Sequence, residues 1–192
     1  MKKTFLIIVN IFLIAKVCSQ ATSNITYGLK LGLAVVNTQI DYPNNINTSS
    51  SGSTSLIFGG FLNIPLSKKT AFQPTLLFVN KGVRESSQML NYNYIDQIHY
   101  LEIPLIWLHQ NPQKIGTYFI GGGLSPAFLI RDEFYNVNKF DLGINLLTGF
   151  KFPVGFSVNA AYTHGLLNLS ADKQRILKFK NNYLSIAIGY EF

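Results

Sequence analysis

The side chains that could do chemistry in this chain are few, because only 13% of its 192 residues are charged and it has one cysteine and 3 histidines. Six ionisable residues share one property: each falls on the small-residue side of a segment in which bulky apolar residues alternate with small or polar ones. They are Lys30, Glu102, Arg131, Asp141, Lys151 and Glu191. A charge that is buried without a partner costs several kcal/mol, so we expect these groups to pair.

Two pairings follow from the order of the segments. Arg131 and Asp141 flank one polar stretch on neighbouring segments, so both could meet at the mouth of a barrel. Lys30 and Glu191 belong to the first and last segments, which pair when a sheet closes on itself. Such a set could form a path for protons or ions. We favour an interior network of salt bridges and hydrogen bonds, because side chains fill the interior of a small barrel.

No sequence pattern for catalysis or for a cofactor is present. His99, His109 and His164 lack the short spacing of a metal site, and no G-x-S-x-G nucleophile motif occurs. Gly121-Gly122-Gly123 matches neither phosphate-binding glycine pattern, and we interpret it as glycine that permits curvature of a strand. We therefore expect a protein that is not an enzyme and that binds no metal, cofactor or nucleic acid.

The elements that position these residues are predicted to be strands, because the chain alternates with a period of two. One face of residues 140–152 is apolar at all but one position: Phe140, Leu142, Ile144, Leu146, Thr148, Phe150 and Phe152. The other face carries small and polar residues such as Gly143 and Asn145, and residues 182–192 repeat the pattern. After the N-terminal segment, no window is apolar for long enough to predict a membrane-spanning helix.

Eight such segments are expected, near residues 25–38, 55–65, 70–82, 97–109, 116–130, 139–152, 154–165 and 182–192. Most are long enough to cross a bilayer as tilted strands, which takes about 9–11 residues. The connections alternate between short ones and long polar ones, as in outer-membrane barrels. The short connections are 65–69, 110–115 and 153, and the long ones are 39–54, 83–96, 131–138 and 166–181. The predicted fold is all-β, an eight-stranded antiparallel up-and-down transmembrane β-barrel with both termini on the periplasmic side.

Alternation alone does not say which face of the strands is inside. Low total charge and many small residues on one face favour an interior of small and polar side chains, with the bulky face in lipid. Phe140, Ile144 and Ile188 would then point outward, and Asn145 and Ser185 inward. The alternative is a soluble, exported, calycin-like binding barrel with the apolar face inside.

The N-terminus has the pattern of a cleaved secretory signal peptide. The basic residues 1–3 precede an apolar stretch at 4–15, and small residues follow around Cys18. We expect residues 1–19 to be removed and residues 20–192 to form one barrel domain. Removal takes away three lysines and the cysteine, and lowers the formal net charge from +7 to +4. A lipoprotein lipidated at Cys18 is an alternative that the preceding residues fit poorly.

Four segments of the mature chain, in order, carry motifs of a known family. Residues 100–105 (YLEIPL) match a Y-L-E-I-P-L strand, and residues 140–150 match a D-x-G…G-F strand. Residues 162–169 are similar to an R-Y-x-x-G-L-x-N-[IL] segment, with alanine in place of the basic residue, and residues 184–192 resemble an L-x-L-G-x-x-F closing strand. The chain thus resembles the PorT-like family of small outer-membrane β-barrels. This resemblance implies an eight-stranded barrel in a Gram-negative outer membrane.

The last strand ends in two outward aromatic residues, Tyr190 and Phe192, which we expect to act as an insertion signal for the barrel-assembly machinery. That machinery could pair with the strand edge while the aromatic ring fills an apolar groove. The alternative is two lipid-facing aromatics at the membrane interface. Residues 172–180 have a local charge of +3, so lipopolysaccharide is an expected contact besides the membrane lipids, with a solvated loop as the alternative.

The expected location is the cell outer membrane, and the expected role is structural or interaction-based. The protein would present its polar loops or assist envelope assembly or protein secretion; the resemblance implies the latter for one family member only. A narrow channel for small solutes is the main alternative. An outer-membrane enzyme is the least supported one.

Overall fold

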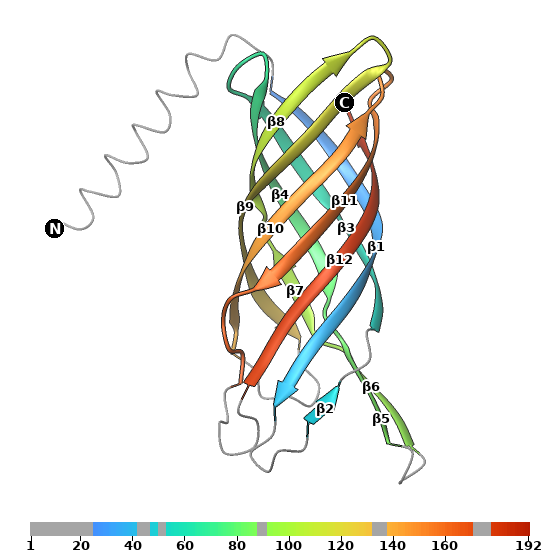
Figure 1. Ribbon diagram of the computed structural model, residues 1–192, viewed down its shortest axis with the longest axis vertical. Helices are drawn as coiled ribbons and strands as arrows, with labels where there is room; N and C mark the ends of the chain where they lie inside the picture. The colour runs from blue at the N-terminus through green and yellow to red at the C-terminus, as the bar shows by residue number, and fades with distance from the viewer. Residues whose placement is uncertain (1–24, 42–46, 50–52, 88–91, 132–137, 171–177) are drawn as a thin grey trace, which may run out of the picture.

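The computed structural model describes residues 25–41, 47–49, 53–87, 92–131, 138–170 and 178–192 (Figure 1). The predicted signal peptide, residues 1–19, lies outside these ranges, as does most of the basic stretch at 172–180. Within the described ranges, no helix has the length and hydropathy needed to cross a membrane. The regular structure that they contain consists of strands.

Antiparallel strands form the closed wall of a barrel (Figure 1). The wall strands are β1 (Thr26–Asp41), β3 (Ser53–Pro65), β4 (Thr70–Asn80), β7 (His99–Glu102), β8 (Leu105–Gln113), β9 (Gly116–Arg131), β10 (Phe140–Lys151), β11 (Phe156–Gly165) and β12 (Lys178–Glu191). Wall strands pair with their neighbours in the chain, except that β7 and β8 each pair with β4 and β9, and β12 pairs with β1 to close the sheet. Because β7 and β8 share one position between β4 and β9, the wall has eight positions. The predicted eight-stranded up-and-down barrel is confirmed.

The fourth wall position is interrupted between β7 and β8 at Ile103 and Pro104, because proline has no N–H group to offer a strand ladder. Both flanking strands pair with β9. The Ile103 N–H donates to the Pro126 carbonyl at 2.8 Å, and the Pro104 carbonyl accepts from the Thr75 N–H at 2.9 Å. The neighbouring strands therefore continue to satisfy the backbone across the interruption.

The two ends of the barrel differ. Residues 66–69, 114–115 and 152–155 form short turns at the end that also holds the C-terminus, which we call the turn end (Figure 1). The opposite end, the loop end, carries the longer connections, as predicted. Glu191, the last residue of β12, therefore lies at the turn end.

Extra strands extend the loop end. β2 (Asn47–Ser49) pairs with β1, and β5 (Val83–Ser87) pairs with β6 (Tyr92–Asp96) in a separate two-stranded sheet that projects beyond the barrel (Figure 1). The sequence predicts a polar loop at 83–96, and the structure replaces much of it with this hairpin. The strand-forming residues Val, Tyr and Ile in these two segments favour the extended backbone.

The bulky face of the strands is the outside of the barrel. Phe140, Ile144 and Ile188 are 42%, 43% and 54% exposed, whereas Asn145 and Ser185 are 4% and 5% exposed. The predicted orientation is therefore confirmed, and a barrel with its apolar face inside is excluded. A continuous apolar exterior needs hydrocarbon around it, and the closed ladder satisfies the backbone there.

Candidate functional site

Three charged side chains form a buried cluster in the loop-end half of the lumen. The Lys81 ammonium lies 3.1 Å from a carboxylate oxygen of Glu102 and 3.1 Å from one of Asp141. Lys81 follows β4, Glu102 ends β7 and Asp141 is the second residue of β10, so three wall positions contribute. The three residues are 2%, 0% and 2% exposed. We call them the loop-end cluster, and their pairing offsets the large cost of burying each charge.

Neutral groups complete the contacts of the loop-end cluster. Ser125 Oγ and the Tyr183 hydroxyl each donate to Glu102 Oε1 at 2.6 Å. The Lys81 ammonium also lies 4.9 Å from the centre of the Tyr100 ring and 5.6 Å from that of Tyr183, within cation–π range. Because side chains from several strands bind one another here, the loop-end cluster crosslinks the wall across the lumen.

An apolar layer lies on the loop side of this cluster. It contains the buried side chains of Ile98, Tyr100, Ala127, Leu169 and Phe179. The Leu169 N–H donates to the Phe179 carbonyl at 2.8 Å, and the Asn168 side-chain oxygen accepts from the Phe179 N–H at 2.9 Å. The segment after β11 is thereby folded into the barrel mouth, with Leu169 fully buried.

Apolar and amide side chains fill the middle of the lumen. The buried apolar residues there are Ala34, Val36, Ile57, Leu77, Val79 and Ala187 on one side, and Ala71, Ile106, Leu108 and Leu147 on the other. The Asn145 amide donates to Thr163 Oγ1 at 2.7 Å. Two internal cavities bordered by described residues have a volume of about 20 Å³ each, room for about one water molecule. Side chains therefore fill most of the described part of the lumen.

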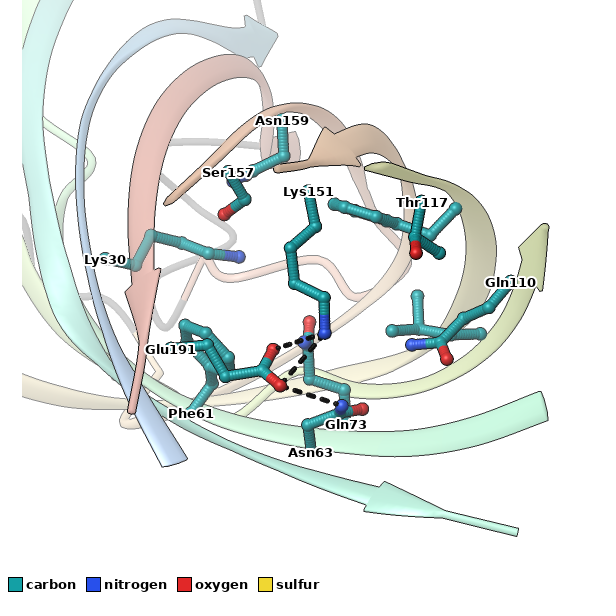
Figure 2. A pocket seen from close by; sticks show the side chains of 12 residues that line it. Lys30, Phe61, Asn63, Gln73, Gln110, Thr117, Lys151, Ser157, Asn159 and Glu191 are labelled. Carbon is teal, nitrogen blue, oxygen red and sulfur yellow. Dashed lines mark hydrogen bonds and ion pairs between the residues drawn. The ribbon is translucent and has the colours of Figure 1, made fainter. Parts of the chain in front are cut away.

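A second group of charges occupies the turn-end half of the lumen (Figure 2). The Lys151 ammonium lies 3.0 and 3.1 Å from the two carboxylate oxygens of Glu191. Glu191 Oε1 also accepts from Thr26 Oγ1 at 2.7 Å and from the Asn63 amide at 3.5 Å. The Lys30 side chain points into the same space (Figure 2). We call Lys30, Lys151 and Glu191 the turn-end cluster.

The structure places five of the six predicted lumen residues inside the barrel, but their partners differ from those expected. Lys30 pairs along the ladder with Gly189, and Glu191 pairs with Gly28, so the two charged residues are offset along the wall. Glu191 instead contacts Lys151, which comes from β10. Contacts across the lumen therefore decide the pairing, in addition to contacts between adjacent strands.

Arg131 departs from the expectation, because it is exposed at the end of β9. His99 pairs with Arg131 whereas Tyr100 pairs with Leu129, so Ile130 is an extra residue in the ladder. Such a bulge reverses the faces of the residues that follow it. Arg131 consequently lies across from the outward His99, and Asp141 binds Lys81 instead.

Lys81 is the functional residue that the sequence analysis missed. It lies within the predicted strand segment 70–82 but was not singled out there, although it has the same parity as the inward residues of β4. These are Ala71, Gln73, Thr75, Leu77 and Val79. Applying the strand parity to every residue of the segment 70–82 places this lysine inside the barrel.

Aromatic side chains gather toward both ends of the outer face. The contacting pairs are Tyr27–Phe192, Tyr118–Phe150, Phe150–Phe152, Phe156–Tyr190 and Tyr190–Phe192 toward the turn end, and Phe58–Phe78 and Phe128–Phe140 toward the loop end. Tyr190 and Phe192 are 37% and 57% exposed, and the Phe192 N–H donates to the Tyr27 carbonyl at 2.8 Å. Two aromatic belts of this kind are typical at the two interfaces of a bilayer.

The three histidines lie on the outer face. His99 stacks on Phe78 with ring centres 5.3 Å apart, and His109 and His164 are exposed. Among the described residues, no three His, Cys, Asp or Glu side chains are grouped as a metal site requires. The histidines are thus separated by the barrel wall from both charged clusters.

Comparisons with known proteins agree with this geometry. Residues 18–171 match the family model described as outer membrane protein beta-barrel domain. The crystal structure of the outer membrane protein OprG from Pseudomonas aeruginosa aligns with 87% of this chain and 95% of its own, with a TM-score of 0.51 and 13% identity. That of Neisserial surface protein A (NspA) covers 88% of this chain and 100% of its own, with a TM-score of 0.53 and 10% identity. No curated protein matches the sequence. At these identities the structural likeness is one of fold.

Proposed function

The chain belongs to the family of the outer membrane protein beta-barrel domain, and from this membership we propose that it is a closed barrel with a structural or interaction-based role. Its working parts are the segments at the loop end, which it presents outside the membrane. The barrel anchors these segments and takes no catalytic part. Among them, the β5–β6 hairpin is the element that reaches furthest beyond the wall (Figure 1).

The filled lumen is the observation that carries this proposal. A channel needs a continuous water path. In this barrel the loop-end cluster and the apolar layer beside it are buried, and two cavities in the middle and the turn-end half of the lumen measure only about 20 Å³ each. The hairpin offers another kind of contact, because the edges of a two-stranded sheet can pair with an extended segment of a partner. Envelope assembly or protein secretion would supply such partners.

A place within the PorT-like family is part of the same proposal. The YLEIPL segment supports it through the roles of its residues here: Tyr100 faces the Lys81 ammonium, Glu102 binds it, and Pro104 interrupts the strand. Residues of this motif build the loop-end cluster that fills the lumen, which is a reason for the same residues to recur in related barrels. This membership brings with it a Gram-negative outer membrane, and the signal-peptide pattern of the N-terminus supports the removal of residues 1–19.

Contacts with the membrane complete the proposal. Tyr190 and Phe192 act as the insertion signal for the barrel-assembly machinery, supported by their exposure at the end of β12. The outer face contacts membrane lipids, and lipopolysaccharide meets the loop end.

Conductance across planar bilayers tests the closed barrel. We expect no steady single-channel current from the purified protein. If the loop-end cluster blocks the lumen, a Lys81→Ala variant should give such currents. Steady currents from the unaltered protein would overturn the proposal in favour of a narrow channel.

Crosslinking in native outer membranes tests the interaction role. A photo-reactive residue at position 85 in the hairpin should capture specific proteins, whereas the same residue at the lipid-facing position 146 should capture lipid. Capture of lipid alone at both positions would remove the interaction role.

A further inference from the structure

Lys30 brings a cation into the turn-end cavity that no carboxylate balances. Its ammonium lies 5.9 Å from the centre of the Phe61 ring, and among the described residues no carboxylate oxygen lies within ion-pair distance of it. The nearby Glu191 carboxylate already accepts from Lys151, Thr26 and Asn63. The turn-end cluster therefore has two cations and one anion, and an unbalanced charge in a barrel interior is costly.

The same cavity is lined by polar side chains that have hydrogen bonds to spare (Figure 2). Gln73, Ser157 and Asn159 are 8%, 8% and 5% exposed. Within the described part of the chain, none of these three side chains has a hydrogen-bond partner. Each can donate an N–H or O–H group to a particle in the cavity, because these three residues line it. With the ammonium groups of Lys30 and Lys151 against the single carboxylate of Glu191, the lining favours a hydrogen-bond acceptor that carries negative charge.

The size of the cavity limits what it can hold. Its volume of about 20 Å³ exceeds the roughly 10–15 Å³ that one water molecule needs, so it admits a single particle somewhat larger than water. An open groove of about 620 Å³ at the turn end shares Thr117, Lys151 and Glu191 with the cavity. A small ion could thus enter from the turn end of the barrel, while a larger anion would be held back in the groove.

We propose that the turn-end cavity binds one monovalent anion of chloride size, held by the Lys30 ammonium and by donors from Ser157 and Asn159. The anion neutralises the excess charge of the turn-end cluster and satisfies its donors. The loop-end cluster has the opposite excess, with one cation and two carboxylates, but the apolar side chains of the middle layer, such as Leu77 and Leu147, separate the two clusters.

Bromide, which has nearly the size of chloride and a strong anomalous signal, is the direct probe. Crystals of the full barrel grown in sodium bromide should show one anomalous peak within hydrogen-bond distance of Lys30 Nζ. The peak should vanish in a Lys30→Met variant and remain in Lys114→Met, which removes an exposed lysine of the outer groove. A cavity without a peak, or a peak that survives Lys30→Met as an adventitious ion only, would overturn the proposal.

Thermal unfolding in detergent gives a second measurement that needs no crystal. At equal ionic strength, the melting temperature of the unaltered protein should be about 2–4 °C higher in chloride than in gluconate, which is too large for the cavity. Ser157→Ala, which keeps Lys30 and should fold, is expected to lose part of this difference, and Lys114→Met none of it. Equal melting temperatures of the unaltered protein in the two salts would refute the site.

Discussion

Tyr183 of β12 and Glu102 of β7 are joined across the lumen by a hydrogen bond of 2.6 Å, although their strands are not neighbours in the wall. The bond ties the closing strand to the interrupted strand on another side of the barrel. It shows how the interior stabilises a wall whose strands otherwise contact only their neighbours.

Removing the Tyr183 hydroxyl should destabilise the barrel. Tyr183→Phe takes a donor from a buried carboxylate, and a hydrogen bond to a charged group is worth about 1.5–3 kcal/mol. Urea unfolding from lipid vesicles, followed by the fluorescence of Trp107, the single tryptophan, measures the loss. Tyr118→Phe, on the outer face and 56% exposed, is the matched control and should change the free energy of unfolding by less than about 0.5 kcal/mol. Equal effects of the two changes would contradict the role of the bond.

Removing the central lysine should cost more. Lys81→Met leaves Glu102 and Asp141 buried without their cation, and breaking a buried ion pair costs about 3–5 kcal/mol. The combined variant K81M/E102Q/D141N contains no charge at this point and should recover much of the lost stability in the same unfolding experiment. A single variant as stable as the unaltered protein would show that the loop-end cluster is not a crosslink.

A charge on the middle of the outer face should be tolerated poorly. Leu146 lies near the centre of β10 and is 58% exposed. Leu146→Arg should lower the free energy of unfolding in vesicles by about 2–4 kcal/mol, the cost of such a charge at the bilayer midplane. Leu146→Met, a similar apolar side chain, should leave it nearly unchanged. If arginine had no more effect than methionine, this face would not lie in lipid.

Deleting Phe192 should reduce the amount of folded protein in the outer membrane. The expected reason is loss of the insertion signal, read out as the fraction of protein whose gel mobility differs between unboiled and boiled samples. Phe152→Ala separates this role from that of the aromatic belt, because Phe152 is also exposed at the turn end, at 44%, but is not terminal. A similar loss in both variants would mean that Phe192 acts only as one belt residue.

The wall of the barrel could be predicted from the sequence because the two faces of each wall strand have different surroundings. Lipid outside and a crowded interior impose a period of two on every strand, and that period survives in segments such as residues 140–152. The same rule assigned Glu102, Asp141 and Lys151 to the interior. It depends only on local order, which a single sequence contains.

The partners of these charges could not be predicted in the same way. Which side chains meet across the lumen depends on the tilt and register of strands that are not neighbours, as for Lys151 and Glu191. One extra residue near Ile130 was enough to reverse the face of Arg131. The strand pattern also gave no signal for the β5–β6 hairpin, whose two strands pair with each other in a sheet separate from the barrel wall.

The seam between β1 and β12 is one of the longest ladders of the wall, running from Gly28 opposite Glu191 to Asp41 opposite Lys178. It joins the first wall strand to leave the ribosome with the last. An incomplete sheet has two unpaired edges. The edge of β1 stays unpaired until β12 has been synthesised. The wall can therefore close only after β12 has been made and has paired with β1.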